Sequence, residues 1–244
     1  MKRKIVSILL AAIIVLGLLP SLALAQGYPD AEAWALGCCA IIAERNELDP
    51  YEFGMPLKGA EIGTTSFLYV QLLSRDWNIN SRDDLIGTIE RMTDNGHNVE
   101  FAELYKRAAA VTEKELEILV MLGDDFMLRH SLTKLFGDKW GDKQIKAWDW
   151  FRMIHLASWG FSAGYLEREE AYDLMIPIIE RLRATFSSWD EATDNYMDGY
   201  AWWSYTDVSE PDTEYQLRLQ LYEELKARSP EHNLFDPAVW DDSE

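Results

Sequence analysis

Apolar residues recur along most of this chain at intervals of three and four positions, the spacing that places them on one face of an α-helix. No stretch alternates apolar and polar residues convincingly over the length of a β-strand. The pattern predicts an all-α fold of about nine helices around an aromatic core. The predicted helices cover residues 31–45, 64–75, 82–95, 101–109, 113–136, 143–163, 168–186, 190–205 and 214–227.

Local capping signals fix several helix ends. Ser81 with Asp84, and Thr112 with Glu115, have the spacing of a capping box. The hydroxyl oxygen of the first residue accepts a free backbone N–H, and the carboxylate of the second accepts the backbone N–H of the first. Gly164 suits the left-handed residue that closes a helix.

The segment from Ala147 to Ser204 contains six of the ten tryptophans, which indicates an aromatic core. The helix over 143–163 is apolar on nearly every side and is predicted to be the central buried helix. Gly199 has no side chain, so another helix can approach it closely. Trp240 is predicted to dock the C-terminal tail against the body.

The first 25 residues have the layout of an export signal: a basic start, an apolar run and a small-residue cleavage site, represented by Lys2, Arg3 and Lys4, by residues 5–19, and by Ala23, Leu24 and Ala25. The apolar run is short for a bilayer span, so a cleaved signal is favoured over a retained membrane anchor. We expect a periplasmic or extracellular protein in which residues 26–244 form one helical domain, without membrane association after cleavage.

Loss of that signal would remove three cations and move the formal net charge from −19 to −22. So acidic a chain lacks the basic surface that nucleic acids and anionic lipids require. An acidic surface suits a cationic partner, but it also simply keeps an exported protein soluble, which is the favoured interpretation.

Two features of the sequence could suggest chemistry, a pair of neighbouring cysteines and a match to a serine hydrolase motif, but their context argues against it. Cys38 and Cys39 are neighbours in a predicted helix, so they cannot bridge each other, and buried apolar packing is favoured over an intermolecular disulfide. The segment from Gly160 to Gly164 matches the G-x-S-x-G pattern of serine hydrolases, and Asp207 or Asp212 followed by His232 gives the right chain order. However, Ser162 ends a predicted helix and no strand precedes it, which argues against a nucleophile elbow. We find no cofactor motif.

Asp149, Arg152 and His155 follow one another at three-residue spacing on the central helix, so they are predicted to share one face. A buried charge needs a partner, and an Asp149–Arg152 ion pair is the favoured interpretation. The alternative is an acid or base in a cleft, since burial beside a charge also tunes catalytic groups.

Asp190, Asp194 and Asp198 recur at intervals of four and form an acidic ridge. Like charges at this spacing repel, so solvent, a cation such as Arg152, or a metal ion should compensate. A solvated ridge is favoured; a metal site is the weaker hypothesis, because the pattern lacks the glycine turn of a calcium loop.

The chain resembles a bacterial family, the YbeU- and YbeR-like proteins, which carry a domain of unknown function of the 1266 series. The resemblance covers about 77–240 and rests mainly on Ala147, Trp148, Asp149, Arg152, Gly160, Gly164, Tyr165, Glu170, Ala171, Ser188, Trp189, Tyr196, Gly199 and Trp203. It implies an α-helical domain without an assigned activity. Tyr200 stands where the family often has a basic residue, which removes one partner for the acidic groups.

Three functions are compatible with these features. The leading hypothesis is a non-catalytic domain that binds a protein or small ligand through aromatic residues, the candidates being Trp148, Trp189, Tyr196 and Trp203. The second is an enzyme, with or without a metal ion, whose acidic pocket contains Asp149, Arg152, His155, Trp189 and Asp194. The third is an immunity-like protein whose acidic face binds a basic partner.

Overall fold

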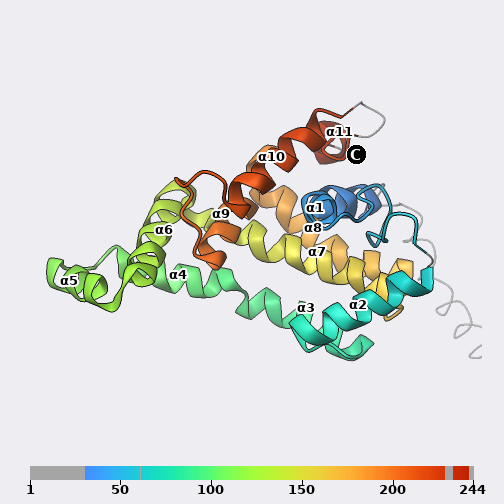
Figure 1. Ribbon diagram of the computed structural model, residues 1–244, viewed down its shortest axis with the longest axis horizontal. Helices are drawn as coiled ribbons and strands as arrows, with labels where there is room; N and C mark the ends of the chain where they lie inside the picture. Colours follow the sequence, from blue (N-terminus) through green and yellow to red (C-terminus); the bar gives the residue numbers. More distant parts are fainter. Residues whose placement is uncertain (1–30, 61, 229–232, 242–244) are drawn as a thin grey trace, which may run out of the picture. The chain divides into compact units, whose positions relative to one another are not determined.

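Helix α7 (Lys146–Ala163) is the centre of the structure, a computed structural model that describes residues 31–60, 62–228 and 233–241. Most of its residues are buried, because helices pack against it on several sides. These neighbours are α1 (Ala31–Arg45), α2 (Ile62–Trp77), α3 (Arg82–Asn95), α4 (His97–Ala108), α8 (Arg168–Thr185) and α9 (Trp189–Ser204) (Figure 1). The prediction of a central helix without a polar face is confirmed.

The remaining helices lie outside this inner group. They are α5 (Glu113–Leu122), α6 (Asp124–Trp140), the 3-10 turn η2 (Gly141–Lys143), α10 (Glu214–Lys226) and the short α11 (Pro237–Asp241). No β-strand occurs in the described residues, and the all-α prediction is confirmed; Leu48 and Leu57 form one isolated antiparallel bridge. None of the described helices combines the length and apolar character needed to cross a bilayer.

Several predicted helix boundaries were wrong, among them the start of α7 at Lys146 where 143 was expected and the end of α6 at Trp140 where 136 was expected. The helix expected over 113–136 is divided at Gly123, whose φ of 117° and ψ of 171° no helical residue adopts. The helix expected to begin at Phe101 begins at His97 instead. The local sequence gives no cap for that earlier start, because the N-cap residue is Gly96 and carries no side chain.

Other local predictions are confirmed. The Ser81 hydroxyl accepts the Asp84 N–H at 3.2 Å, and Thr112 and Glu115 form a complete capping box. Gly164 closes α7 in the left-handed conformation at φ 79°. At Gly199, an added Cβ would lie 2.3 Å from the Cβ of Trp148, so α7 and α9 could not approach as closely with any other residue.

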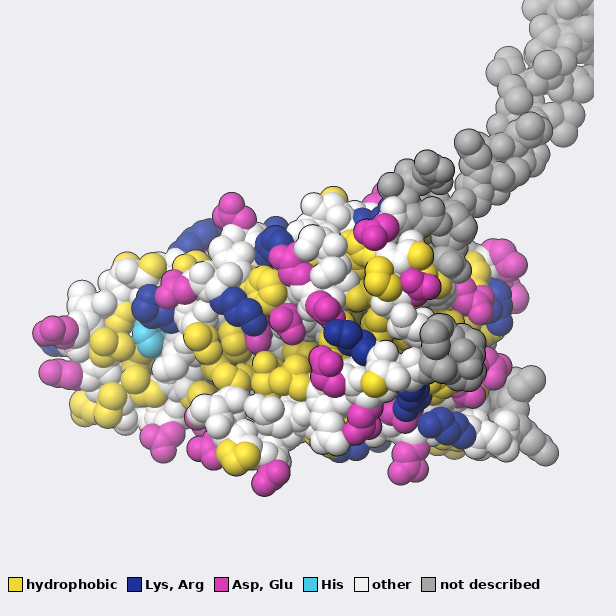
Figure 2. Space-filling model, turned by 90° about the horizontal axis from the view of Figure 1, so that it is seen from above, with side chains coloured by type: hydrophobic (Ala, Val, Ile, Leu, Met, Phe, Trp, Pro, Cys, Tyr) yellow, Lys and Arg dark blue, Asp and Glu magenta, His cyan; other side chains and the backbone are white. Residues whose placement is uncertain are grey.

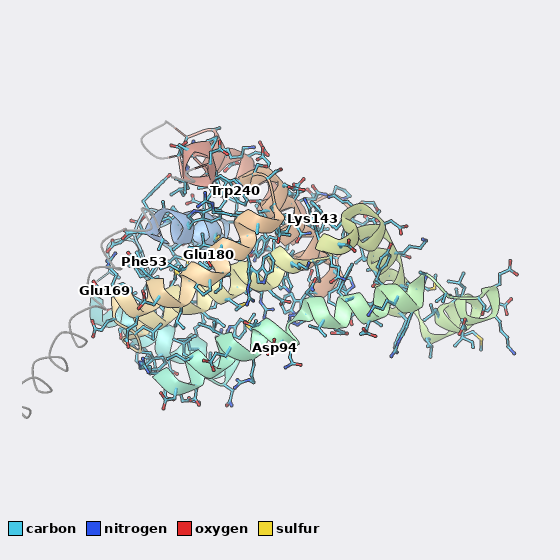
Figure 3. The ribbon with its side chains drawn as sticks, turned by 180° about the vertical axis from the view of Figure 1, so that it is seen from behind. Phe53, Asp94, Lys143, Glu169, Glu180 and Trp240 are labelled. Carbon is cyan, nitrogen blue, oxygen red and sulfur yellow. The ribbon has the colours of Figure 1, made fainter. Side chains whose placement is uncertain are left out.

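The C-terminal tail is held by Trp240, as predicted (Figure 3). Its side chain is buried, and its ring centroid lies 4.7 Å from that of Trp34 on α1 and 5.2 Å from that of Trp189 on α9. The predicted export signal, Ser229, Pro230 and His232 lie outside the described residues.

Candidate functional site

Asp149 is buried in the first turn of α7, with 3% of its surface exposed, and faces the start of α4. Its Oδ1 accepts the His97 N–H at 3.1 Å, and its Oδ2 accepts the Asn98 N–H at 2.7 Å. The first N–H groups of a helix have no partner within the helix and carry partial positive charge. Asp149 therefore caps α4 from another helix, because it accepts the hydrogen bonds that the side chain of an N-cap residue usually accepts.

Gly96 makes this arrangement possible. A Cβ at position 96 would lie 2.2 Å from Oδ2 of Asp149 and 2.6 Å from its Cγ, distances that real Cβ atoms do not reach. The carboxylate thus occupies the space that any larger residue would fill. Asp149 on α7 and Gly96 just before α4 are therefore complementary, although they lie far apart in the sequence.

Arg152 lies one turn further along α7, and the predicted ion pair is present, with 3.6 Å between Nη1 and Oδ1 of Asp149. Its guanidinium carbon is 4.6 Å from the ring centroid of Trp77 and 4.8 Å from that of Trp148, so the cation contacts both indoles. Burial lowers the pKa of Arg152, and the nearby carboxylate of Asp149 opposes that shift.

His97 completes the cluster. Its Nδ1 lies 2.7 Å from Nη1 of Arg152. Because a guanidinium has donors and no acceptor, Nδ1 must accept, and the ring proton of His97 lies on Nε2. Sequence reasoning missed His97 and Trp77. The signal that could have identified His97 is its position in a Gly-His-Asn sequence where a new helix begins. Trp77 lies at the end of a helix, and no local signal marks it.

An open cleft of about 490 Å³ lies beside this cluster. Its lining consists of Trp77, Met92, Asn95, Gly96, His97, Val99, Glu100, Glu103, Asp149 and Arg152. Glu100 accepts a hydrogen bond from Arg129 at 3.1 Å and Glu103 accepts one from Lys106 at 2.7 Å. Among the described lining residues, Arg152 is the one Arg or Lys and is paired with Asp149. The exposed carboxylates of Glu100 and Glu103 form an acidic rim.

His155 does not join this cluster, which corrects the expectation of a shared face. Each three-residue step on a helix turns by about 60°, so two steps separate His155 from Asp149 by about 120°. The ring is buried and its Nε2 donates to the Cys38 carbonyl at 3.0 Å. Burial lowers the pKa of His155 to about 4, so this is a neutral core histidine.

The acidic ridge on α9 is compensated by lysines and not by Arg152. Asp198 is buried and accepts from Lys139 at 2.7 Å, and Asp190 accepts from Lys226 at 2.5 Å. Asp194 is exposed; desolvation raises its pKa most, partly opposed by Lys139, and the two other aspartates raise it further. In the part of the chain that the structure describes, no group of three or more His, Cys, Asp or Glu side chains is arranged to hold a metal ion.

The four aromatic binding candidates fall into two clusters. Trp148 contacts Tyr196 at 5.4 Å and Trp203 at 5.5 Å between ring centroids. Trp203 is 45% exposed, whereas Trp148 and Tyr196 are buried. Trp189 is buried in a separate cluster with Trp34, at 4.6 Å. Of the four, Trp203 alone offers a substantial exposed surface.

Ser162 and the two cysteines have structural surroundings. The Ser162 hydroxyl donates to the Gly54 carbonyl at 2.7 Å, near the end of α7, which is no strand-to-helix turn. Cys38 and Cys39 are free and buried, and Cys39 lies 3.6 Å from the hydroxyl oxygen of Ser158. Burial raises the pKa of both thiols, that of Cys39 to about 12.

Comparison with known proteins places residues 72–232 in a match to the family described as "Protein of unknown function (DUF1266)". The chain is 32% identical over 151 residues to "Uncharacterized protein YbeU" of Escherichia coli (strain K12), covering 62% of this chain and 64% of that protein. It is 32% identical over 132 residues to "Uncharacterized protein YbeR" of the same organism, covering 54% of this chain and 56% of that protein. Each match thus spans less than two thirds of the relative. No solved structure matches.

Proposed function

The chain belongs to the DUF1266 family of proteins of unknown function, and we propose that it is a non-catalytic binding protein whose cleft beside Arg152 takes a peptide with a free carboxylate and a basic side chain. The observation that carries this proposal is the guanidinium of Arg152. It makes one hydrogen bond to a described residue, His97, and its side chain, with 14% of its surface exposed, lines an open cleft.

The position of Arg152 favours recognition of a carboxylate. A guanidinium presents N–H groups in a planar fork that matches the two oxygens of a carboxylate. Contacts with Trp77 and Trp148 hold the plane of that fork. A side chain that is already ordered loses little conformational entropy when a ligand binds, so the free energy of the contact contributes to affinity.

The acidic rim favours a ligand that also carries a cation. Glu100 and Glu103 line the same cleft as Arg152, and their present partners, Arg129 and Lys106, are not lining residues. A basic side chain next to the carboxylate of the ligand would lie near two negative charges. Electrostatic complementarity of this kind selects among ligands and raises the association rate.

The chemistry of the cluster supports binding over acid–base catalysis. Both oxygens of Asp149 already accept backbone N–H groups, which leaves the carboxylate poorly placed to accept a proton from a substrate. His155 is buried against the Cys38 carbonyl, and Asp194 is on the surface among the lysine-paired aspartates. The groups of the alternative enzyme hypothesis therefore do not meet in one cleft.

Peptide arrays would test the proposal. One array of random peptides ends in free carboxylates, and its twin carries the same sequences as amides. We expect the wild-type protein to select peptides with a free carboxylate and a basic residue near it, and Arg152→Met to weaken that binding at least about tenfold. Lys134→Met, which removes a surface cation whose partner Asp138 also lies outside the cleft lining, should bind like the wild type. Equal binding to both arrays would refute the proposal.

We further propose that the protein is exported and works in the periplasm or outside the cell, on the strength of the signal-like sequence of its first 25 residues. Fractionation of cells that express the full gene, followed by N-terminal sequencing of the product, tests this directly. Cleavage after Ala25 is the expected result; an intact N-terminus in the cytoplasmic fraction would refute export.

A further inference from the structure

Helix α5 and the start of α6 expose large apolar side chains that no other described part of the chain covers. No residue of α5 is buried. The exposed fractions are 48% for Ile118, 62% for Val120, 85% for Met121, 55% for Leu122 and 53% for Phe126. We name these five residues the α5 surface. Figure 1 shows α5 at the end of the helical unit beside α6, and Figure 2 shows apolar side chains gathered at that end.

The spacing of these residues and the cap of their helix indicate that the α5 surface is an ordered part of the fold. Ile118, Met121 and Leu122 follow the three-and-four spacing that places them in one stripe. The helix starts at a complete capping box of Thr112 and Glu115, so its N-terminal end is fixed locally. A contiguous apolar stripe on the surface of a soluble protein costs solubility, and such patches commonly mark interaction sites.

The charge around the α5 surface decides the kind of partner. Residues 113–126 contain five acids and one lysine, and the acids Glu113, Glu117, Asp124 and Asp125 are exposed. A second copy of this chain would bring the same acidic charge, and an anionic lipid surface would be repelled as well. We propose that the α5 surface docks a basic amphipathic helix of a partner protein, with apolar side chains on the stripe and lysines or arginines beside the acids.

The spacing of the stripe suits such an occupant. Anchor residues of a docked amphipathic helix repeat at three and four positions, which matches the spacing of Ile118, Met121 and Leu122. Met121 is the most exposed of the five, and the flexible thioether of methionine adapts to side chains of different shape. The surface therefore suits a partner defined by charge and apolar spacing.

A direct test uses a fluorescein-labelled peptide of leucine and lysine, about 18 residues long with helical spacing. Two twins accompany it, one with glutamate in place of lysine and one with the same composition in scrambled order. Fluorescence anisotropy with the full chain should show saturable binding of the first peptide only. Ile118→Gln and Met121→Gln should each weaken this binding at least about tenfold. Both side chains are exposed, so neither change disturbs a core.

The matched control is Phe67→Gln, because Phe67 is an apolar residue on α2 whose exposed fraction of 63% lies between those of Ile118 and Met121. Binding that survives this control and falls with Met121→Gln supports the proposal. The absence of saturable binding, equal binding of either twin, or equal loss in Phe67→Gln would overturn it. Sedimentation that shows a dimer which Met121→Gln dissociates would also overturn it, in favour of a second copy of the chain.

Discussion

Replacement of Asp149 by asparagine tests whether this carboxylate holds α4 in place. The change keeps the shape of the side chain, but its amide nitrogen now faces one of the two backbone N–H groups that the carboxylate accepts at 3.1 and 2.7 Å. It also removes the negative charge beside the start of α4 and the partner of Arg152. A lost hydrogen bond to a charged group is worth about 1.5–3 kcal/mol, and breaking a buried ion pair costs about 3–5 kcal/mol when the remaining charge is fully buried.

Since Arg152 keeps 14% of its side chain exposed, we expect Asp149→Asn to lower the free energy of unfolding by about 3 kcal/mol. For a chain of this size that corresponds to a fall in Tm of about 6–12 °C. Arg152→Met should lower the free energy of unfolding by less, about 1–2 kcal/mol. In this variant Asp149 keeps both backbone N–H donors, while the contacts of the guanidinium with the two indoles are lost.

The double variant should be less destabilised than the sum of the two single variants by about 1 kcal/mol or more, because each change removes the other's partner. Urea unfolding followed in parallel by tryptophan fluorescence and far-UV circular dichroism gives these free energies. The control is Asp94→Asn, which removes an exposed carboxylate on α3 (Figure 3) and should change stability by less than about 0.5 kcal/mol. Effects that add within about 0.5 kcal/mol would refute the coupling of Asp149 and Arg152. A larger loss in Arg152→Met than in Asp149→Asn would refute the capping role.

Three further outcomes follow from individual contacts. Gly96→Ala should destabilise by about 2 kcal/mol or more in thermal melts, because its Cβ would overlap the capping carboxylate. Gly87→Ala on α3 should stabilise slightly, because its Cβ would meet the flexible end of the Arg91 side chain at 3.4 Å. Burial lowers the pKa of His155 from 6.5 to about 4, so the neutral ring contributes its full stability to the fold above pH 6.5. The free energy of unfolding should fall by about 3 kcal/mol as the pH drops towards 4. In His155→Gln, the urea midpoint should lose this dependence on pH. The thiols of Cys38 and Cys39 should react with Ellman's reagent only in denaturant, and fast native labelling would contradict their burial.

The sequence was sufficient for features that depend on neighbouring residues. The starts of α3 and α5 follow from Ser81 and Thr112, whose caps act within three residues. The burial of α7 follows from its apolar composition, and the close contact at Gly199 follows from the absence of a side chain. Each of these depends on short-range geometry or on bulk hydrophobicity, which a single sequence contains.

The candidate site depends on contacts that no local pattern contains. The cap of α4 comes from Asp149, which lies 51 and 52 residues beyond the N–H groups it accepts. For that reason the sequence pattern predicts the start of α4 four residues too late and does not identify His97 as part of the site. The face shared by Asp149 and Arg152 was foreseen from their spacing, but extending it to His155 ignored the rotation that accumulates over two steps. The break at Gly123 was missed because helical periodicity continues on both sides of it.

The cluster around Asp149 explains how a charged pair is tolerated inside an apolar helix, and why its surface suits binding. The carboxylate is stabilised by the N–H groups of α4 and by Arg152, and the guanidinium in turn by the indoles of Trp77 and Trp148. Together with His97 on α4, which contacts the guanidinium as well, residues of α2, α4 and α7 therefore fix one cation at the wall of the cleft before any ligand arrives. The entropy cost of ordering Arg152 is included in the free energy of folding, so a carboxylate that reaches it meets donors already in position.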